Sequence, residues 1–384
     1  MGDMSRYSEA DYPINQARLI RDRRERSIAM MAEYGLDALL LGRPSNVSFV
    51  SGSIRPWSAG SRAFVPSCVV AASGDLYLMT ASDHGIPDEI ARDHLYSTTW
   101  NPPALIASLA AISGLDDCRT VGIDAMTPLY ASLLHEAFPK MTFANAEQPL
   151  RRVRMLKTPD ELAHLARAVS MTESSLSVVR DNLRPGTTGG RLRGLFSHRM
   201  TSFGVTVPAL ECTISVAEAR DGRQRGLLPP DAALHHGDLV TAAGSVTHAG
   251  YEGPVSRTWP CLSSGLPPGE EYRQVSAAWE NAWQAVSGQL KPGASGGDLR
   301  RAWADYRSIF PVELTAHAIG VGYEAPFCGT GPGIGFDSPE PLEPTMTLTV
   351  ELSVTYGSAR YVRSEVVVIT HDGFDQLSGR DGAL

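Results

Sequence analysis

The sequence has 384 residues, of which 43% are hydrophobic and 20% are charged, a composition typical of a globular protein with a proper core. The formal net charge of −8 gives no basic field for nucleic acid or for an anionic membrane surface, so neither partner is expected. No apolar run approaches the roughly 20 residues needed to span a bilayer, and the polar first residues lack the apolar part of a signal peptide, so we expect a cytoplasmic protein.

The first part of the chain has the pattern of an α/β domain. An Arg-rich helical pattern covers residues 14–35 and ends at Gly35. Strands that alternate with helices are typical of this fold class. After the first helix, short apolar runs and helical patterns alternate at 37–42, 67–73, 75–80, 103–113, 119–124 and 128–138. We predict an N-terminal α/β domain over residues 1–150.

A helix start marks the entry to a second domain. Thr158 precedes Pro159, and Glu161 follows three residues after Thr158, which is the pattern of a capped N-terminus with proline in the first turn. A long amphipathic run follows it. The domain boundary therefore falls near 148–158, and we predict that the second domain covers residues 151–384.

The second domain contains an internal repeat. Residues 183–196 (LRPGTTGGRLRGLF) and 290–303 (LKPGASGGDLRRAW) match at an offset of 107 residues. Two copies are too few for a solenoid. They indicate a domain of two related α/β halves about a pseudo-twofold axis, with a site where the halves meet.

Three segments of this domain have strand patterns. Residues 237–259 predict a strand, a turn and a second strand, with bends at Gly244 and Gly250. The runs 346–356 and 361–377 predict two more strands, and the second run contains a hairpin turn, Thr-His-Asp-Gly.

Two carboxylates interrupt these otherwise apolar strands. Glu351 and Glu365 each lie inside a β run, where an ionised carboxylate is costly unless it is paired or ligated. His317 lies upstream in a similarly apolar setting. These three residues are the candidate catalytic groups. In the first domain, Arg55 and Arg62 flank Trp57 on a Gly/Ser-rich segment, and we expect them to bind a substrate carboxylate.

The ordered set of motifs resembles the pita-bread family of creatinase, Xaa-Pro dipeptidases and methionine aminopeptidases. Asn46–Gly52 is similar to a segment of that family's N-terminal domain, and Arg154–Glu161 is similar to its entry to the catalytic domain. Further matches in the expected order are the Pro-Gly repeat, GDLV (237–240), GY (250–251) and SRT (256–258). The resemblance covers nearly the whole chain and implies a creatinase-like α/β domain followed by an α+β pita-bread domain.

The resemblance also implies where metal ligands would be. Metal-dependent members of the family hold two divalent ions with two Asp, one His and two Glu. The positions of the last three carry His317, Glu351 and Glu365, but Ala243 and Pro254 stand where the two Asp would be. The family's further upstream histidine falls on Gly226. We therefore expect no dinuclear metal site and no cofactor.

On this basis the expected activity is metal-independent hydrolysis of a non-peptide C–N bond. The substrate would be a small amino-acid-like molecule with a carboxylate, as for creatinase and ectoine hydrolase within the family. Glu351 and Glu365, if close together, would not both ionise easily, so one would act as acid and the other as base. The residues expected to assist them are His317 and Glu252 in catalysis, and His248 and Tyr323 in substrate binding. A homodimer is expected, in which Arg55 or Arg62 could come from the second subunit.

Three alternatives remain open at this stage. The first is a metal-dependent Xaa-Pro aminopeptidase or dipeptidase with a degenerate site. The second is a lyase or cyclase of a specialised pathway. The third is a non-catalytic binding module.

Overall fold

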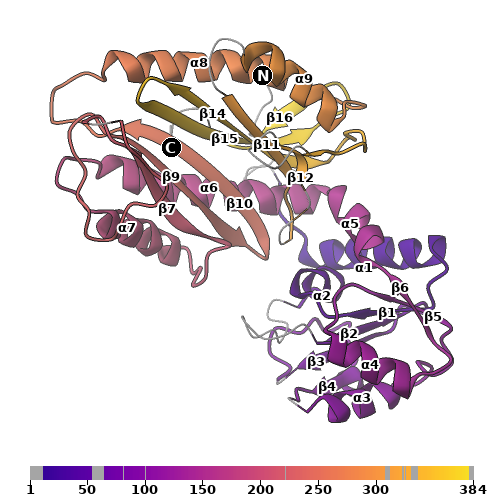
Figure 1. Cartoon of the computed structure of the whole chain (residues 1–384). Helices are drawn as coiled ribbons and strands as arrows, with labels where there is room; N and C mark the ends of the chain where they lie inside the picture. The colour runs from indigo at the N-terminus through magenta and orange to yellow at the C-terminus, as the bar shows by residue number, and fades with distance from the viewer. Residues whose placement is uncertain are drawn as a thin grey trace. The chain divides into compact units, whose positions relative to one another are not determined.

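The computed structural model describes residues 12–53, 65–80, 82–99, 101–220, 222–307, 312–321, 324, 326–329 and 336–379. The chain forms two compact units, one made of Asn15–Arg154 and the other of the residues from Met155 onward (Figure 1). Among the described residues, no helix is both long enough and apolar enough to cross a membrane.

The first unit is a mixed sheet with helices on both faces. The strand order is β4-β3-β2-β1-β5-β6, in which β1 is parallel to β5 and antiparallel to β2. Its elements are α1 (Gln16–Glu33), β1 (Ala38–Leu41), α2 (Pro44–Ser51), β2 (Cys68–Ala71), β3 (Leu76–Thr80), η2 (Arg92–His94), β4 (Leu95–Ser97), α3 (Pro102–Ala110), β5 (Thr120–Ile123), α4 (Pro128–Ala137), β6 (Thr142–Asn145) and α5 (Glu147–Met155). The α/β domain predicted from the alternating pattern is thus confirmed.

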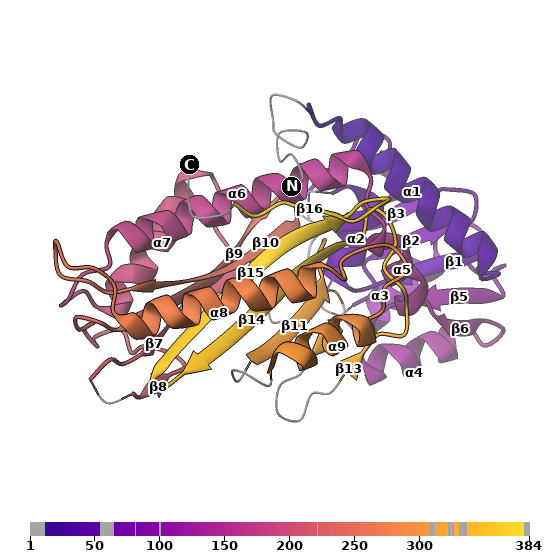
Figure 2. The same cartoon turned by 90° about the horizontal axis from the view of Figure 1, so that it is seen from above.

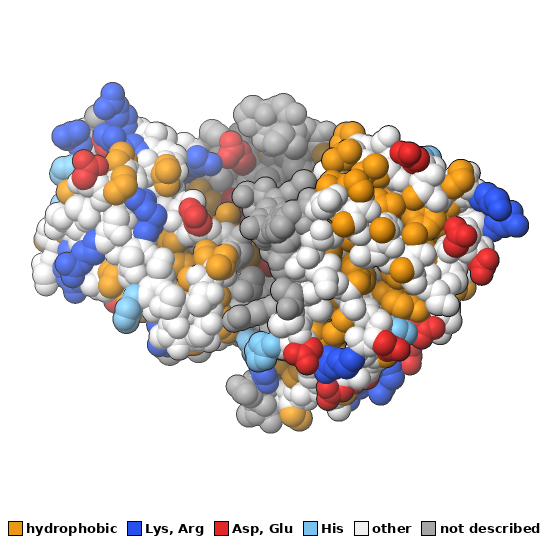
Figure 3. Space-filling view, turned by 90° about the horizontal axis from the view of Figure 1, so that it is seen from below, with side chains coloured by type: hydrophobic (Ala, Val, Ile, Leu, Met, Phe, Trp, Pro, Cys, Tyr) orange, Lys and Arg blue, Asp and Glu red, His pale blue; other side chains and the backbone are white. Residues whose placement is uncertain are grey.

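The apolar side chains of this unit explain its layers. Leu105 and Leu109 of α3 and Leu134 of α4 pack with Leu40 and Val121 of the sheet in one buried core. Helices α1 and α2 lie on the other face of the sheet (Figure 1). Hydrophobic side chains also gather on the surface of this unit that faces the viewer in Figure 3.

The second unit contains two sheets covered by helices on one side. The strand orders are β10-β9-β7-β8 and β13-β12-β11-β14-β15-β16. Its elements are α6 (Pro159–Asp181), α7 (Gly189–Ser202), β7 (Leu210–Ala217), β8 (Gln224–Arg225), β9 (Leu239–His248), β10 (Tyr251–Pro260), α8 (Glu270–Ser287), α9 (Gly296–Arg307), β11 (Val312–Ala318), β12 (Pro326–Gly329), β13 (Phe336–Asp337), β14 (Thr347–Tyr356), β15 (Ala359–Ile369) and β16 (Phe374–Gln376). Figure 2 shows α6 and α8 lying along the same side of these sheets.

The helix start and the internal repeat both have the predicted structure. Thr158 and Glu161 form a reciprocal capping box at the start of α6. The two repeat copies join α6 to α7 and α8 to α9. Gly186 and Gly293, at equivalent positions of the copies, have φ of +89° and +85°, a left-handed conformation that favours glycine. The two halves of the unit therefore begin with the same helix–turn–helix geometry.

The predicted strand–turn–strand segment is the antiparallel pair β9 and β10. The turn lies at Ala249 and Gly250, which both have positive φ. Gly244 is not at a bend, contrary to the prediction. It lies within β9, where a Cβ atom would come within 2.8 Å of the Phe196 ring of α7, so glycine is needed for helix packing.

Strand periodicity separates two faces of these sheets. On β14, Val350 and Leu352 pack into the core beneath α8, and on β10, Gly253 faces the backbone of α6. We call this the helix side. The alternate residues point to the opposite face, which we call the open face. Its central side chains are Ala243, Pro254, Ser256, His317, Glu351 and Ser364.

The approach of β10 to α6 makes a test of this packing. A Cβ atom on Gly253 would lie 2.3 Å from the carbonyl carbon of Ala168, so Gly253→Ala should lower the free energy of unfolding by at least about 1–3 kcal/mol. Gly226→Ala is the matched control, because no atom lies within 4 Å of a Cβ there and its φ is not positive. Urea unfolding of both variants measures the difference; equal stabilities would contradict the packing.

Candidate functional site

The centre of the open face is a pair formed by Ser256 and Glu351. The Ser256 hydroxyl donates to a Glu351 carboxylate oxygen at 2.5 Å, and the Ser256 N–H donates to the Ser364 hydroxyl at 2.8 Å. Ser256 is on β10, whereas Glu351 and Ser364 face each other on β14 and β15. The site therefore lies where the two halves of the second unit meet, as the repeat predicts.

Burial shifts the pKa of the Glu351 carboxyl group. Burial raises the pKa of this carboxyl group, and the hydrogen bond from Ser256 acts in the opposite direction. A carboxylate with a raised pKa is a better proton acceptor near neutral pH than an exposed one. Glu351 thus has the properties of a general base.

His317 shares the open face with Glu351. On β11, Thr315 is the cross-strand partner of Glu351 and His317 is the partner of Thr349. His317 is therefore diagonal to Glu351, a separation of about 7–8 Å between Cα atoms. Burial lowers the pKa of the imidazole, so the neutral ring is favoured at neutral pH.

Glu252 lies on the same face nearer to the β9–β10 turn. It is four residues before Ser256, which corresponds to about 13 Å along the strand. Burial, together with the negative charge of Glu324, raises the pKa of Glu252 to about 7. Glu252 is therefore a titrating carboxylate at one end of the open face.

Glu365 does not join this site. In the register of β14 with β15, Val350 is its partner, so Glu365 points to the helix side, away from Glu351. It is 1% exposed, and it accepts hydrogen bonds from Arg363, Arg257, Gln376 and Ser378. The expectation that Glu351 and Glu365 are neighbours sharing one proton is wrong.

His248 also points away from the open face. Its Nδ1 lies 2.8 Å from Nδ1 of His164 on α6, and the ring of His164 stacks on Tyr251, whose hydroxyl donates to Glu161. The expectation that His248 binds substrate beside the other site residues is therefore wrong, because its place in the strand turns this ring towards α6. Arg55, Trp57, Arg62 and Tyr323 lie outside the described residues, so their predicted role in substrate binding stays a prediction.

The residues present do not fit a two-ion centre. Ala243 and Pro254 face the site but have no atom that coordinates a metal, and Glu365 faces the opposite side. Within the described part of the chain, no group of three or more His, Cys, Asp or Glu side chains could hold a metal ion. Divalent ions of this kind need several oxygen or nitrogen ligands with compensating charge.

Comparison with known proteins defines the class of protein. Residues 163–372 match the Metallopeptidase family M24, and residues 23–156 match the Creatinase/Prolidase N-terminal domain. The chain belongs to the Metallopeptidase family M24, with the creatinase-like N-terminal domain that precedes the catalytic domain. The predicted family is confirmed.

Several of the proteins that the chain resembles are named as Xaa-Pro peptidases. The chain is 24% identical to the Xaa-Pro dipeptidase of Lactobacillus helveticus over 68% of this chain and 70% of that one. It is 25% identical to the Xaa-Pro aminopeptidase of Escherichia coli over 53% of this chain and 49% of that one. The prolidase of Pyrococcus horikoshii has the same fold, with a TM-score of 0.73 at 16% identity, over 94% of this chain and 99% of that one.

These relatives correct the expected reaction. Enzymes named for Xaa-Pro cleavage act on peptide bonds, so the expectation of a metal-independent hydrolase of non-peptide C–N bonds, like creatinase or ectoine hydrolase, is wrong. Hydrolase activity of the peptidase type is what the family supports.

Several site residues were not identified from the sequence. Ser256 and Arg257 were noted only as parts of the SRT motif, and Ser364 was given no role. The signal was present on β10, where the polar residues Ser256 and Thr258 alternate with neighbours that face the helices. Ser364 gave a weaker signal, because the charged Glu365 next to it is the more obvious functional candidate. Glu365, however, lies on the helix side.

The network on the helix side gives a prediction for Glu365. Glu365→Gln leaves the buried guanidinium groups of Arg257 and Arg363 without their shared carboxylate, so the free energy of unfolding should fall by about 3–5 kcal/mol. Glu280→Gln removes a half-exposed carboxylate 3.8 Å from Arg363 and should cost less than about 1 kcal/mol. Thermal and urea unfolding separate the two; a fully stable Glu365→Gln protein would contradict a structural role.

Proposed function

We propose that the protein hydrolyses the peptide bond of short peptides of the Xaa-Pro type at the open face of its second unit. The observation that carries the proposal is the Ser256–Glu351 hydrogen bond on the face that also presents His317. The peptidase relatives support the choice of a peptide bond as the substrate bond.

In this mechanism Glu351 acts as both base and acid. Its carboxylate accepts a proton from a water molecule as the water oxygen bonds to the peptide carbonyl carbon. When the C–N bond breaks, Glu351 returns that proton to the leaving nitrogen. Ser256 is 2% exposed, so its hydroxyl holds the carboxylate in place and is not available to attack a peptide.

His317 stabilises the intermediate. A neutral imidazole can donate its N–H to the carbonyl oxygen as negative charge develops there. In this proposal the carbonyl group and the water lie between the two side chains, whose Cα atoms are about 7–8 Å apart. No step of this mechanism requires Glu365.

Glu252 binds the substrate's free ammonium group in this proposal. Its carboxylate lies on the open face, and Glu324 adds a second negative charge nearby. An ammonium group would stabilise both carboxylates.

The homodimer and the cytoplasmic location stay predictions. Analytical ultracentrifugation of the purified protein would measure the oligomeric state.

Replacement of Glu351 tests the mechanism directly. Glu351→Gln should lower kcat on Ala-Pro by about 10²–10⁴-fold with an unchanged circular dichroism spectrum, because the proton acceptor is lost. Glu280→Gln is the matched control: this half-exposed carboxylate of α8 lies beside Arg363 on the helix side and should change kcat little. Assays with and without added Mn²⁺ show whether cleavage depends on a divalent metal ion. A Glu351→Gln enzyme of normal kcat, or a protein that does not cleave Xaa-Pro peptides in either condition, would overturn the proposal.

Binding of the substrate amine should depend on pH through Glu252. Its folded-state pKa of about 7 means that the carboxylate is mostly neutral below pH 7 and mostly ionised above it. KM for a peptide with a free amine should therefore rise by roughly tenfold from pH 7.5 to pH 6. Glu252→Gln should remove this rise. An N-acetylated peptide controls for the titration of Glu351; the same pH profile for both peptides would contradict the role of Glu252.

A further inference from the structure

We propose that Arg257 is a positioning residue for catalysis, which from the helix side holds Ser256 where its hydroxyl can orient Glu351. The inference rests on the proposed function, because it concerns the same Ser256–Glu351 hydrogen bond. Arg257 follows Ser256 on β10, and its side chain is buried on the opposite face of the strand. It therefore acts through Ser256 and does not touch the substrate.

The two strands that bring Ser256 and Glu351 together belong to different sheets. β10 is a strand of the sheet with β9, β7 and β8, whereas Glu351 lies on β14, in the sheet with β15. Backbone pairing fixes the register within each sheet but not the position of one sheet relative to the other. Where β10 meets β15, the hydrogen bonds of the described residues all involve a side chain. The distance between Ser256 and Glu351 therefore depends on these side chains.

Arg257 connects the two sheets at the site itself. Its Nη1 donates to the carbonyl oxygen of Ser256 at 2.9 Å and also to the carbonyl oxygen of Ser364 on β15. From the other side, the N–H of Ser256 donates to the hydroxyl of Ser364, which lies on the open face. The same two residues are thus joined from both faces. Ser364 is the cross-strand partner of Glu351, so holding Ser256 against Ser364 also holds it against Glu351.

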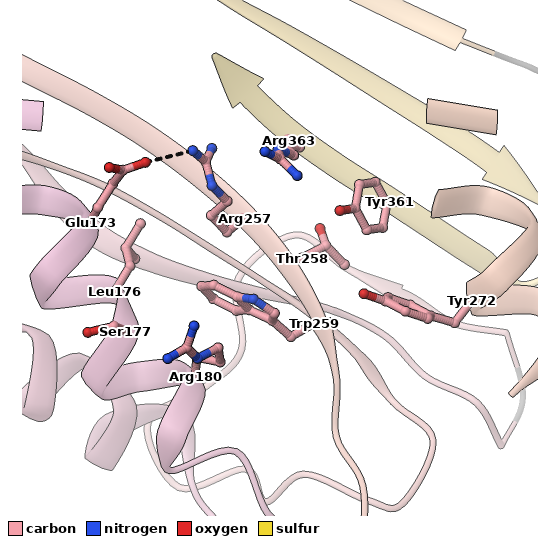
Figure 4. Close-up of a pocket in the computed structure, with 10 residues that line it drawn as sticks. All are labelled: Glu173, Leu176, Ser177, Arg180, Arg257, Thr258, Trp259, Tyr272, Tyr361 and Arg363. Atoms are coloured by element: carbon pink, nitrogen blue, oxygen red, sulfur yellow. Dashed lines mark hydrogen bonds and ion pairs between the residues drawn. The ribbon is translucent and has the colours of Figure 1, made fainter. Parts of the chain in front are cut away.

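The other end of the guanidinium group is anchored to α6. Nη2 donates to Glu173 at 2.8 Å, to the carbonyl oxygen of Gly379 at 3.2 Å and to Glu365 at 3.5 Å. Figure 4 shows Glu173 extending from α6 towards Arg257 on β10. Glu173 also accepts from the N–H of Gly379 at 2.9 Å, so its carboxylate is itself fixed. The charge of Arg257 is compensated by these carboxylates, and the role that we assign to it is geometric. A planar guanidinium group can donate in these several directions, which a lysine ammonium group cannot reproduce.

Arg257→Lys keeps the positive charge and removes this geometry. On Ala-Pro, kcat should fall about tenfold or more while KM changes less than about twofold, because a displaced catalytic group slows the reaction without altering the substrate contacts. Arg199→Lys is the matched control and should keep a normal kcat. Arg199 of α7 bonds to the Ser174 hydroxyl of α6, next to Glu173, and its hydrogen bonds within the described chain reach neither β10 nor β15.

A double-mutant cycle with Ser256→Ala separates positioning from a general loss of stability. If Arg257 acts through Ser256, Arg257→Lys should lower kcat by less than about twofold in the Ser256→Ala background, although it still lowers Tm there. Equal losses of kcat in both backgrounds, or a normal kcat in either single variant, would overturn the proposal. If Arg257→Lys does not fold, Glu173→Gln takes its place in the cycle, with an expected loss of about threefold in kcat and the same dependence on Ser256.

A crystal structure of Arg257→Lys tests the positioning without turnover. The distance from the Ser256 hydroxyl to the nearest Glu351 oxygen should lengthen from 2.5 Å to beyond hydrogen-bonding range, about 3.5 Å, and Arg199→Lys should keep the short distance. An unchanged distance in Arg257→Lys would refute the positioning role, whichever peptide the protein cleaves. A lengthened distance in a protein that cleaves no Xaa-Pro peptide would support this role and refute only the peptidase assignment.

Discussion

The alternation of side chains along β14 and β15 is the constraint on which the candidate site depends. A strand presents successive residues to opposite faces, so the register that pairs Glu351 with Ser364 necessarily turns Glu365 to the helices. One carboxylate is then left with a hydroxyl partner on the open face, and the other becomes the anion of a buried ionic network. The same rule on β10 places Ser256 in the site and Arg257 behind it.

Much of the fold could be predicted because local signals agreed with the tertiary packing. The alternating strands and helices of the first unit, the Thr158 cap and the repeated Pro-Gly turns each reflect chemistry within a few residues. Gly244 shows the limit of such reading. A glycine within a strand pattern suggests a bend. Only the position of the Phe196 ring on α7 shows that glycine is needed because a larger side chain would clash with that ring.

The site could be predicted only in part, for a related reason. Glu351 and His317 were recognisable as polar groups in apolar strands. The faces on which Glu351 and Glu365 lie depend on pairing register, which the composition of either strand does not determine. Ser256 and Arg257 were harder still, since their roles come from β10 lying beside β15, about a hundred residues away along the chain.

Ala243 and Pro254 also determine what substitution alone could add to the open face. An aspartate at both positions would add two carboxylates to the open face but not that of Glu365, which would reach this face only if β15 shifted by one residue. Such a shift would turn every side chain of β15 to the opposite face at once, including the buried Arg363. Aspartates at positions 243 and 254 alone would therefore not give the open face the set of ligands that a two-ion centre needs.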